Sequence, residues 1–205
     1  MRFLPSALCG AALLLASAAA PSPDALKETA PETFYARFET SKGPFVVQVN
    51  RAWAPHGADR FYNLVKSGFY DGQRFYRVVK GFMVQWGIHG QPEVAAPWAS
   101  ARIPDDPVKE RNDVGTITFA KSGANSRTTQ VFINYADNRR LDKQGFAPFG
   151  VVVDGLDVVK KLYGGYGDMQ PEGRGVDTSK LYREGNAYLD REYPKLDKIL
   201  KASIQ

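Results

Sequence analysis

Short apolar runs, separated by glycine, proline or polar turns, recur from residue 34 to residue 153 and constrain the fold most strongly. Residues 34–40 and 45–50 are joined by Ser41-Lys42-Gly43-Pro44, a pattern that predicts a β-hairpin. Further strands are expected at residues 74–79, 82–86, 116–120, 130–134 and 149–153. Many short strands with few helices favour a closed antiparallel β-barrel over a layered α/β fold.

Two helices are expected to accompany this barrel. Pro55 suits the first turn of a helix that runs to about Ser67, with Phe61 and Leu64 on one face and Gly68 as its stop. Residues 156–162 predict a second, shorter helix. Residues 88–114, which are rich in proline, are expected to form a surface loop.

The C-terminal part of the chain is less regular. Residues 163–176 are rich in glycine and are expected to be flexible, and residues 178–192 have helical content. Residues 196–204 suit a closing strand, although their lysine spacing fits a helix nearly as well. The predicted domain spans residues 34–205 and includes residues 163–205 as an extended C-terminal segment.

The N-terminus has the pattern of a signal peptide. Arg2 precedes an apolar stretch, and small residues near Ala18–Ala20 offer a cleavage site, so residues 1–20 are expected to direct export to the periplasm or out of the cell. Residues 21–33 are expected to form a linker. Cys9 is the only cysteine, so the mature chain would have no disulfide, no cysteine nucleophile and no cysteine-ligated zinc. Once the signal peptide is cleaved, no stable membrane insertion is expected. Lipid attachment at Cys9 is a minor alternative, because Leu8 stands where a small residue is expected.

Charge and motif content exclude several classes of function. The net charge is +5, with no Lys/Arg run that would bind nucleic acid. His56 and His89 lack the spacing of metal ligands, and neither a phosphate-binding loop nor a G-x-S-x-G serine motif is present. No metal or cofactor is therefore expected.

Two segments carry the chemistry: FYRVVKGFMVQ at residues 75–85 and TQVFIN at residues 129–134. They combine one arginine, Arg77, with Phe82, Met83 and the alternating pair Gln130 and Phe132. A fixed cation beside a floor of Phe and Met suits a site that holds a proline ring and acts on its amide bond. Twisting that bond costs on the order of 20 kcal/mol, and a guanidinium can stabilise the nitrogen lone pair of the twisted state without any covalent step.

These segments resemble the cyclophilin family of peptidyl-prolyl isomerases, whose motif reads FHRxxxGFMxQ. The resemblance covers roughly residues 34–153 and implies a barrel capped by two helices, with Arg77 as the catalytic arginine. It also implies that nine further residues contact the substrate: Phe82, Met83, Gln85, Ala120, Lys121, Gln130, Phe132, Leu141 and Phe146.

The chain departs from the family pattern at a few positions. Tyr76 replaces the usual histidine, Arg140 stands where a tryptophan often precedes the pocket leucine, and Phe146 replaces a second histidine. The catalytic arginine and the pocket floor are retained, so isomerase activity is expected. Tight binding of the cyclic inhibitor cyclosporin is not expected, because the tryptophan helps to form its site.

The sequence thus predicts an exported, monomeric peptidyl-prolyl cis-trans isomerase that acts on proline-containing peptides and on folding proteins. Two alternatives stay open. The domain would be a binding module if it gripped proline peptides without turnover, which Arg77 argues against. The second alternative is a closed β-barrel that carries a small apolar ligand, and the polar pair Gln85 and Gln130 beside Arg77 argues against it.

Overall fold

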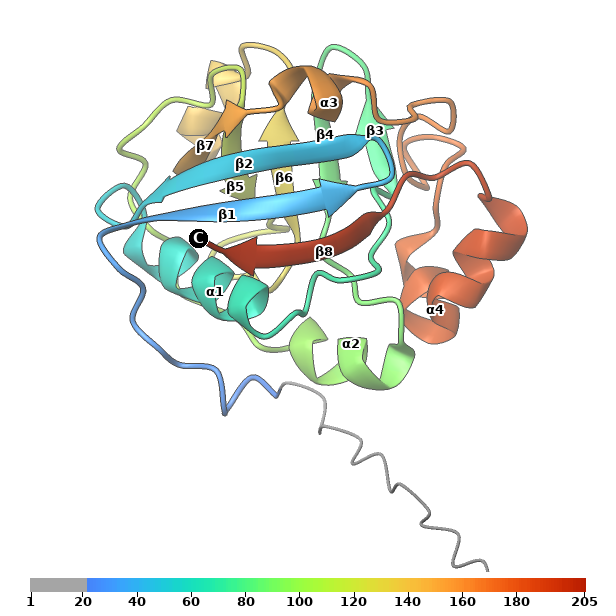
Figure 1. Cartoon of the computed structure of the whole chain (residues 1–205), viewed down its shortest axis with the longest axis horizontal. Helices are drawn as coiled ribbons and strands as arrows, with labels where there is room; N and C mark the ends of the chain where they lie inside the picture. Colours follow the sequence, from blue (N-terminus) through green and yellow to red (C-terminus); the bar gives the residue numbers. More distant parts are fainter. Residues whose placement is uncertain (1–21) are drawn as a thin grey trace, which may run out of the picture.

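Eight antiparallel strands form one curled sheet, with its helices at the periphery (Figure 1). The computed structural model describes residues 22–205, so the predicted signal peptide and Cys9 lie outside the described residues. The order of strands in the sheet is β3-β4-β6-β5-β7-β2-β1-β8. The strands are β1 (Thr33–Thr40), β2 (Gly43–Asn50), β3 (Arg77–Val79), β4 (Met83–Trp86), β5 (Thr116–Phe119), β6 (Val131–Asn134), β7 (Pro148–Asp154) and β8 (Ile199–Ile204).

The predicted hairpin is confirmed, because β1 and β2 pair in register from Thr33–Asn50 to Thr40–Gly43. The predicted closure of the barrel is realised only in part. β3 and β8 stand at the two ends of the strand order, so the sheet is a curled half-barrel. Its ends meet at an isolated bridge between Arg74 and Lys198 and a hydrogen bond from the Phe75 N–H to the Asp197 carbonyl (3.0 Å). Arg74 makes only this isolated bridge, so the strand predicted at residues 74–79 is regular only over Arg77–Val79.

The main core lies inside the curl of the sheet and is rich in aromatic rings. Phe38 stacks on Phe45 with ring centroids 4.9 Å apart, and the Trp86 ring meets Phe38 edge-on at 5.7 Å. Helix α1 (Pro55–Lys66) covers one side of this core with its apolar face, which includes Phe61 and Leu64. The helix begins with Pro55 in its first turn and is followed by Gly68 at φ 71°, a left-handed conformation that favours glycine.

Helix α2 (Pro92–Ala99) corrects the prediction of an irregular loop at residues 88–114. Pro92 lies in the first turn, where a helix needs no backbone N–H, so this proline does not interrupt it. Val94, Ala95 and Trp98 are buried on its inner face. The remaining helices are the 3-10 helix η1 (Arg139–Gln144), α3 (Leu156–Lys160) and α4 (Thr178–Glu192).

The segment between α3 and β8, residues 161–198, lies beside β3 and β4 and includes α4 (Figure 1). It packs around a second apolar cluster that contains Tyr76, Leu181, Tyr188 and other buried side chains. Gly185 has φ 62° inside α4 and approaches the Gly90 carbonyl so closely that a Cβ would lie 2.1 Å from that oxygen. A glycine is therefore required where α4 contacts the segment before α2.

Both terminal parts of the described chain pack against the rest of the domain. The Ala30 N–H donates to the Asp59 carboxylate (2.9 Å), and the Glu28 N–H donates to Asn63 Oδ1 (3.1 Å), so part of the predicted linker lies against α1. β8 settles the open alternative for residues 196–204 in favour of a strand, which pairs with β1. Within residues 22–205, no helix combines the length and apolar character needed to cross a membrane.

Candidate active site

Three neighbouring strands bring Arg77, Gln85 and Phe132 into one row. Arg77 on β3 pairs with Gln85 on β4, and Gln85 pairs in turn with Phe132 on β6. Because side chains alternate between the two faces of a sheet, Met83 and Gln85 lie on this face. Val84 and Trp86 face the main core instead.

This face forms one wall of a cavity of about 290 Å³. All ten residues predicted from the sequence line it: Arg77, Phe82, Met83, Gln85, Ala120, Lys121, Gln130, Phe132, Leu141 and Phe146. Their placement around one cavity is what the prediction requires, whereas the role of each residue stays a prediction. Five further residues complete the lining: Ser122, Ser126, Thr128, Met169 and Thr178.

The floor of the cavity is apolar. Met83, Phe132 and Leu141 form a buried cluster separate from the main core, and Phe146 packs against it. The Phe132 and Phe146 rings meet edge to face, with centroids 5.8 Å apart and planes at 71°. This arrangement offers a compact ring such as proline an apolar surface on which hydrophobic burial stabilises the complex.

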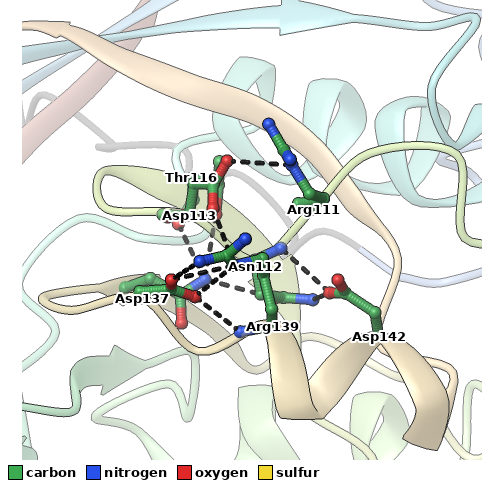
Figure 2. A network of polar contacts seen from close by, with 8 residues as sticks. Arg111, Asn112, Asp113, Thr116, Asp137, Arg139 and Asp142 are labelled. Atoms are coloured by element: carbon green, nitrogen blue, oxygen red, sulfur yellow. Dashed lines mark hydrogen bonds and ion pairs between the residues drawn. The ribbon is translucent and has the colours of Figure 1, made fainter.

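A polar network holds Leu141 and Phe146 in place behind this floor, and Figure 2 shows two of its members, Asn112 and Asp142, among neighbouring polar side chains. The Asn112 side chain donates to the Asp142 carboxylate (2.7 Å) and to the Phe146 carbonyl (2.9 Å). The Asn138 side chain donates to the Phe82 carbonyl (2.8 Å). Since Asp142 follows Leu141 in η1, these bonds fix the loop that carries the pocket wall.

A second polar network runs along the other side of the cavity. The Arg77 Nη1 donates to Gln85 Oε1 (2.9 Å), and Gln85 Nε2 donates to the Tyr76 hydroxyl (3.1 Å) and to Gln130 Oε1 (3.0 Å). The Tyr76 hydroxyl donates to Gln130 Oε1 (2.6 Å). Both N–H groups of the Gln85 amide are therefore used inside the protein, so Gln85 orients Arg77 and Gln130 in the structure described here.

Tyr76, at the position where the family has histidine, is buried. Burial raises the pKa of the Tyr76 hydroxyl above its ordinary value of 10.0. The hydroxyl therefore stays protonated at physiological pH and acts as a fixed hydrogen-bond donor, whereas a histidine there would titrate near neutrality.

Two cations besides Arg77, which itself lies 5.8 Å from the centre of the Phe82 ring, border the aromatic rings of the site. Lys121 lies 3.2 Å from the Asp105 carboxylate and 5.6 Å from the centre of the Phe146 ring. The Arg140 guanidinium lies over Phe82, 4.8 Å from the ring centre. Arg140 thus occupies the face of an aromatic ring at the edge of the cavity, and an apolar ligand would have to compete with it there.

Residues 163–193 also contribute to the site, which the sequence did not predict. Met169 and Thr178 line the cavity, Asp168 pairs with Arg77, and the Tyr182 hydroxyl accepts a hydrogen bond from Gln130 Nε2 (3.2 Å). Asp177 caps the start of α4 by accepting from the Ser179 and Lys180 N–H groups. The Asp177-Thr178-Ser179 sequence is a local signal for this helix start, but no local signal indicates that the helix faces the site.

No group of three or more His, Cys, Asp or Glu side chains in residues 22–205 is arranged to hold a metal ion. Among the described residues, the cavity is lined by the Arg77 guanidinium, the Lys121 ammonium, neutral amides and hydroxyls, and an apolar floor. These groups can bind a peptide and stabilise a polarised amide.

A half-barrel with an arginine and an apolar pocket on its outer face defines a class of peptide-binding enzymes, and comparison with known proteins identifies the family. Residues 35–179 match the model of the family described as "Cyclophilin type peptidyl-prolyl cis-trans isomerase/CLD". The chain belongs to this family, and its members are peptidyl-prolyl cis-trans isomerases.

Characterised relatives agree with this assignment. Peptidyl-prolyl cis-trans isomerase B of Escherichia coli (strain K12) is 33% identical over 179 residues, which cover 80% of this chain and 95% of the relative. Peptidyl-prolyl cis-trans isomerase A of Dickeya dadantii (strain 3937) is 38% identical over 134 residues, which cover 60% of this chain and 67% of the relative.

The fold is shared with solved structures. A crystal structure of a cyclophilin type peptidyl-prolyl cis-trans isomerase from Cryptosporidium parvum matches 84% of this chain and 98% of its own, with a TM-score of 0.61 and 19% identity. A second structure of that protein, in the presence of the dipeptide Ala-Pro, matches with a TM-score of 0.60 and 18% identity.

Proposed function

We propose that this protein accelerates cis-trans isomerisation of X-Pro bonds in exported proteins and so assists their folding. The observation that carries the proposal is the position of Arg77 at the border of a cavity whose floor is Met83, Phe132 and Leu141. Uncatalysed X-Pro isomerisation takes tens to hundreds of seconds, slow enough to limit folding.

The proposed mechanism uses binding and electrostatics alone. The proline ring of the substrate lies on the apolar floor, which holds one side of the X-Pro bond. As the bond twists, the nitrogen loses amide resonance and regains a lone pair. The Arg77 guanidinium then donates a hydrogen bond to that nitrogen. Since the planar ground state has no such lone pair, this interaction stabilises the transition state selectively.

Nuclear magnetic resonance exchange spectroscopy on a proline tetrapeptide tests the enzymatic part of the proposal. A substoichiometric amount of protein should speed exchange between the cis and trans signals many-fold, and heat-denatured protein should not. Peptide binding without faster exchange would instead favour the alternative of a binding module. Light scattering on the same sample should give the mass of a monomer.

The site of action follows from the N-terminal pattern. We propose that residues 1–20 are removed on export and that the mature protein works in the periplasm or outside the cell. The intact mass of protein recovered from its native host tests this. We expect the protein in an extracytoplasmic fraction, with the mass of a chain that begins near Pro21. A cytoplasmic protein that retains Met1 would contradict the proposal.

A further inference from the structure

The active-site arginine is held by a residue from the C-terminal part of the chain. Arg77 Nε lies 2.6 Å from Asp168 Oδ1, and Nη2 donates to Asp168 Oδ2 at 3.3 Å. The two side chains are 18% and 29% exposed, so water screens this ion pair less than it would screen a pair on the open surface. The Asp168 carboxylate accepts from Nε and Nη2 on one edge of the guanidinium, and Gln85 Oε1 accepts from Nη1.

This pairing determines which donors remain for a substrate. An arginine has five N–H groups, of which three bond to Asp168 and Gln85. The two that remain lie on Nη1 and Nη2, at the tip of the side chain. Because an arginine side chain has several rotatable bonds, a carboxylate that grips Nε and Nη2 fixes the plane of the fork before substrate arrives.

The loop that carries Asp168 is itself braced. The Asp168 carbonyl accepts from the Gly175 N–H (2.8 Å), and its carboxylate also accepts from the Met169 N–H (2.8 Å). The Tyr193 hydroxyl donates to the Gly175 carbonyl (2.8 Å), which ties the loop to the second apolar cluster. A Cβ on Gly173 would lie 2.4 Å from the Asp168 carbonyl oxygen, so the loop closes tightly around Asp168.

We propose that Asp168 is a positioning residue for the isomerase reaction: its carboxylate orients the Arg77 guanidinium toward the twisted X-Pro bond. This rests on the isomerase function proposed above. The bracing of the loop favours a fixed support over a lid. The orientation of the guanidinium matters most in the twisted state, because the nitrogen lone pair forms only there. Loss of the Asp168 carboxylate should therefore lower kcat more than it raises KM.

The test compares Asp168→Asn with Asp190→Asn. Asparagine keeps the shape of Asp168 and one acceptor oxygen but loses the charge and the second acceptor. Asp190 is the matched control, since it belongs to the same segment and pairs with Arg74 (2.7 Å), and neither of these residues lines the cavity. Asp168→Asn should lower kcat roughly tenfold with KM changed less than about twofold, and Asp190→Asn should leave both within about twofold.

A second measurement reports directly on whether Asp168 holds the Arg77 side chain in one orientation. In a proton–nitrogen correlation spectrum, the Arg77 Nε–H signal should be sharp in the unaltered protein, broadened in Asp168→Asn and unchanged in Asp190→Asn. A kcat in Asp168→Asn equal to or above that of the unaltered protein would overturn the proposal, as would an equal loss in both variants. If the unaltered protein showed no isomerase activity, the proposed function would fail, yet the Nε–H signal would still report whether Asp168 holds Arg77.

Discussion

Replacing Phe132 by alanine should weaken both the fold and substrate binding. The side chain is 4% exposed and packs edge-on against Phe146. Truncating a Phe in a sealed core costs about 3–5 kcal/mol, but Phe132 borders a cavity that water can enter. We therefore expect a loss of about 2–3 kcal/mol in the free energy of unfolding, and a fall of roughly 4–12 °C in Tm.

Gln85→Ala is the matched comparison, because Gln85 is 3% exposed and lies opposite Phe132 on the next strand. Its loss removes hydrogen bonds to three side chains, but Arg77 keeps Asp168 and the Tyr76 hydroxyl still donates to Gln130. Because the cavity is open, water can replace part of what is lost. We expect a cost of about 1 kcal/mol, or roughly 2–4 °C in Tm.

The two variants should also separate in kinetics. Phe132→Ala removes part of the apolar floor and should raise KM. Gln85→Ala removes the hydrogen bond from Arg77 Nη1, so the guanidinium is less well oriented and kcat should mainly fall. Differential scanning calorimetry gives the first comparison, and exchange spectroscopy on a proline tetrapeptide gives the second. If Gln85→Ala melted far below Phe132→Ala, the assignment of these side chains to pocket and polar network would be wrong.

Three other changes test the site. Arg77→Ala should lower kcat/KM at least about tenfold, a loss of roughly 1.4 kcal/mol; Arg74→Ala, outside the cavity, is the control, and full activity in a folded Arg77→Ala protein would refute the assignment. Arg140→Trp should tighten inhibition by cyclosporin with little change in kcat/KM, measured by titration; nanomolar inhibition of the unaltered protein would show that another residue supplies the contact. Burial raises the pKa of Tyr76, so the folded state holds that proton more firmly than the unfolded chain does. Stability should therefore be full below pH 10.0 and fall above it, and a Tm that stayed constant through that range in thermal melts would contradict this reasoning.

Local rules were sufficient to predict most of the strands, whereas the floor of the pocket was predicted from the resemblance of residues 75–85 and 129–134 to the family motif. Alternation along β4 and β6 places Met83 and Phe132 on the opposite face of the sheet from the core residues beside them, and this alternation can be read from the sequence. A glycine at position 81, with φ 73°, marks the turn that places Arg77 opposite Gln85. Each of these features is decided within a few residues.

The support from the C-terminal segment could not be predicted in this way. Asp168 lies 91 positions from Arg77 in the chain, and nothing around it distinguishes it from other acidic residues in a glycine-rich stretch. Its position depends on how α4 packs against α2 and Tyr76, which is a matter of tertiary structure. Helix α2 was missed for the opposite reason: its prolines are a strong local signal for a loop, and burial of Trp98 and its neighbours outweighs it.

The pairing of β8 with β1 has a consequence for the synthesis of the protein. Residues 199–204 are made last among the strands, so one edge of β1 stays without its partner while the rest of the chain is translated. The turn that leads into Arg77 also lacks its hydrogen bonds from residues 197–199 until then. A nascent chain that has not yet reached residues 197–204 therefore lacks both the β1–β8 pairing and the hydrogen bonds that hold the turn before Arg77.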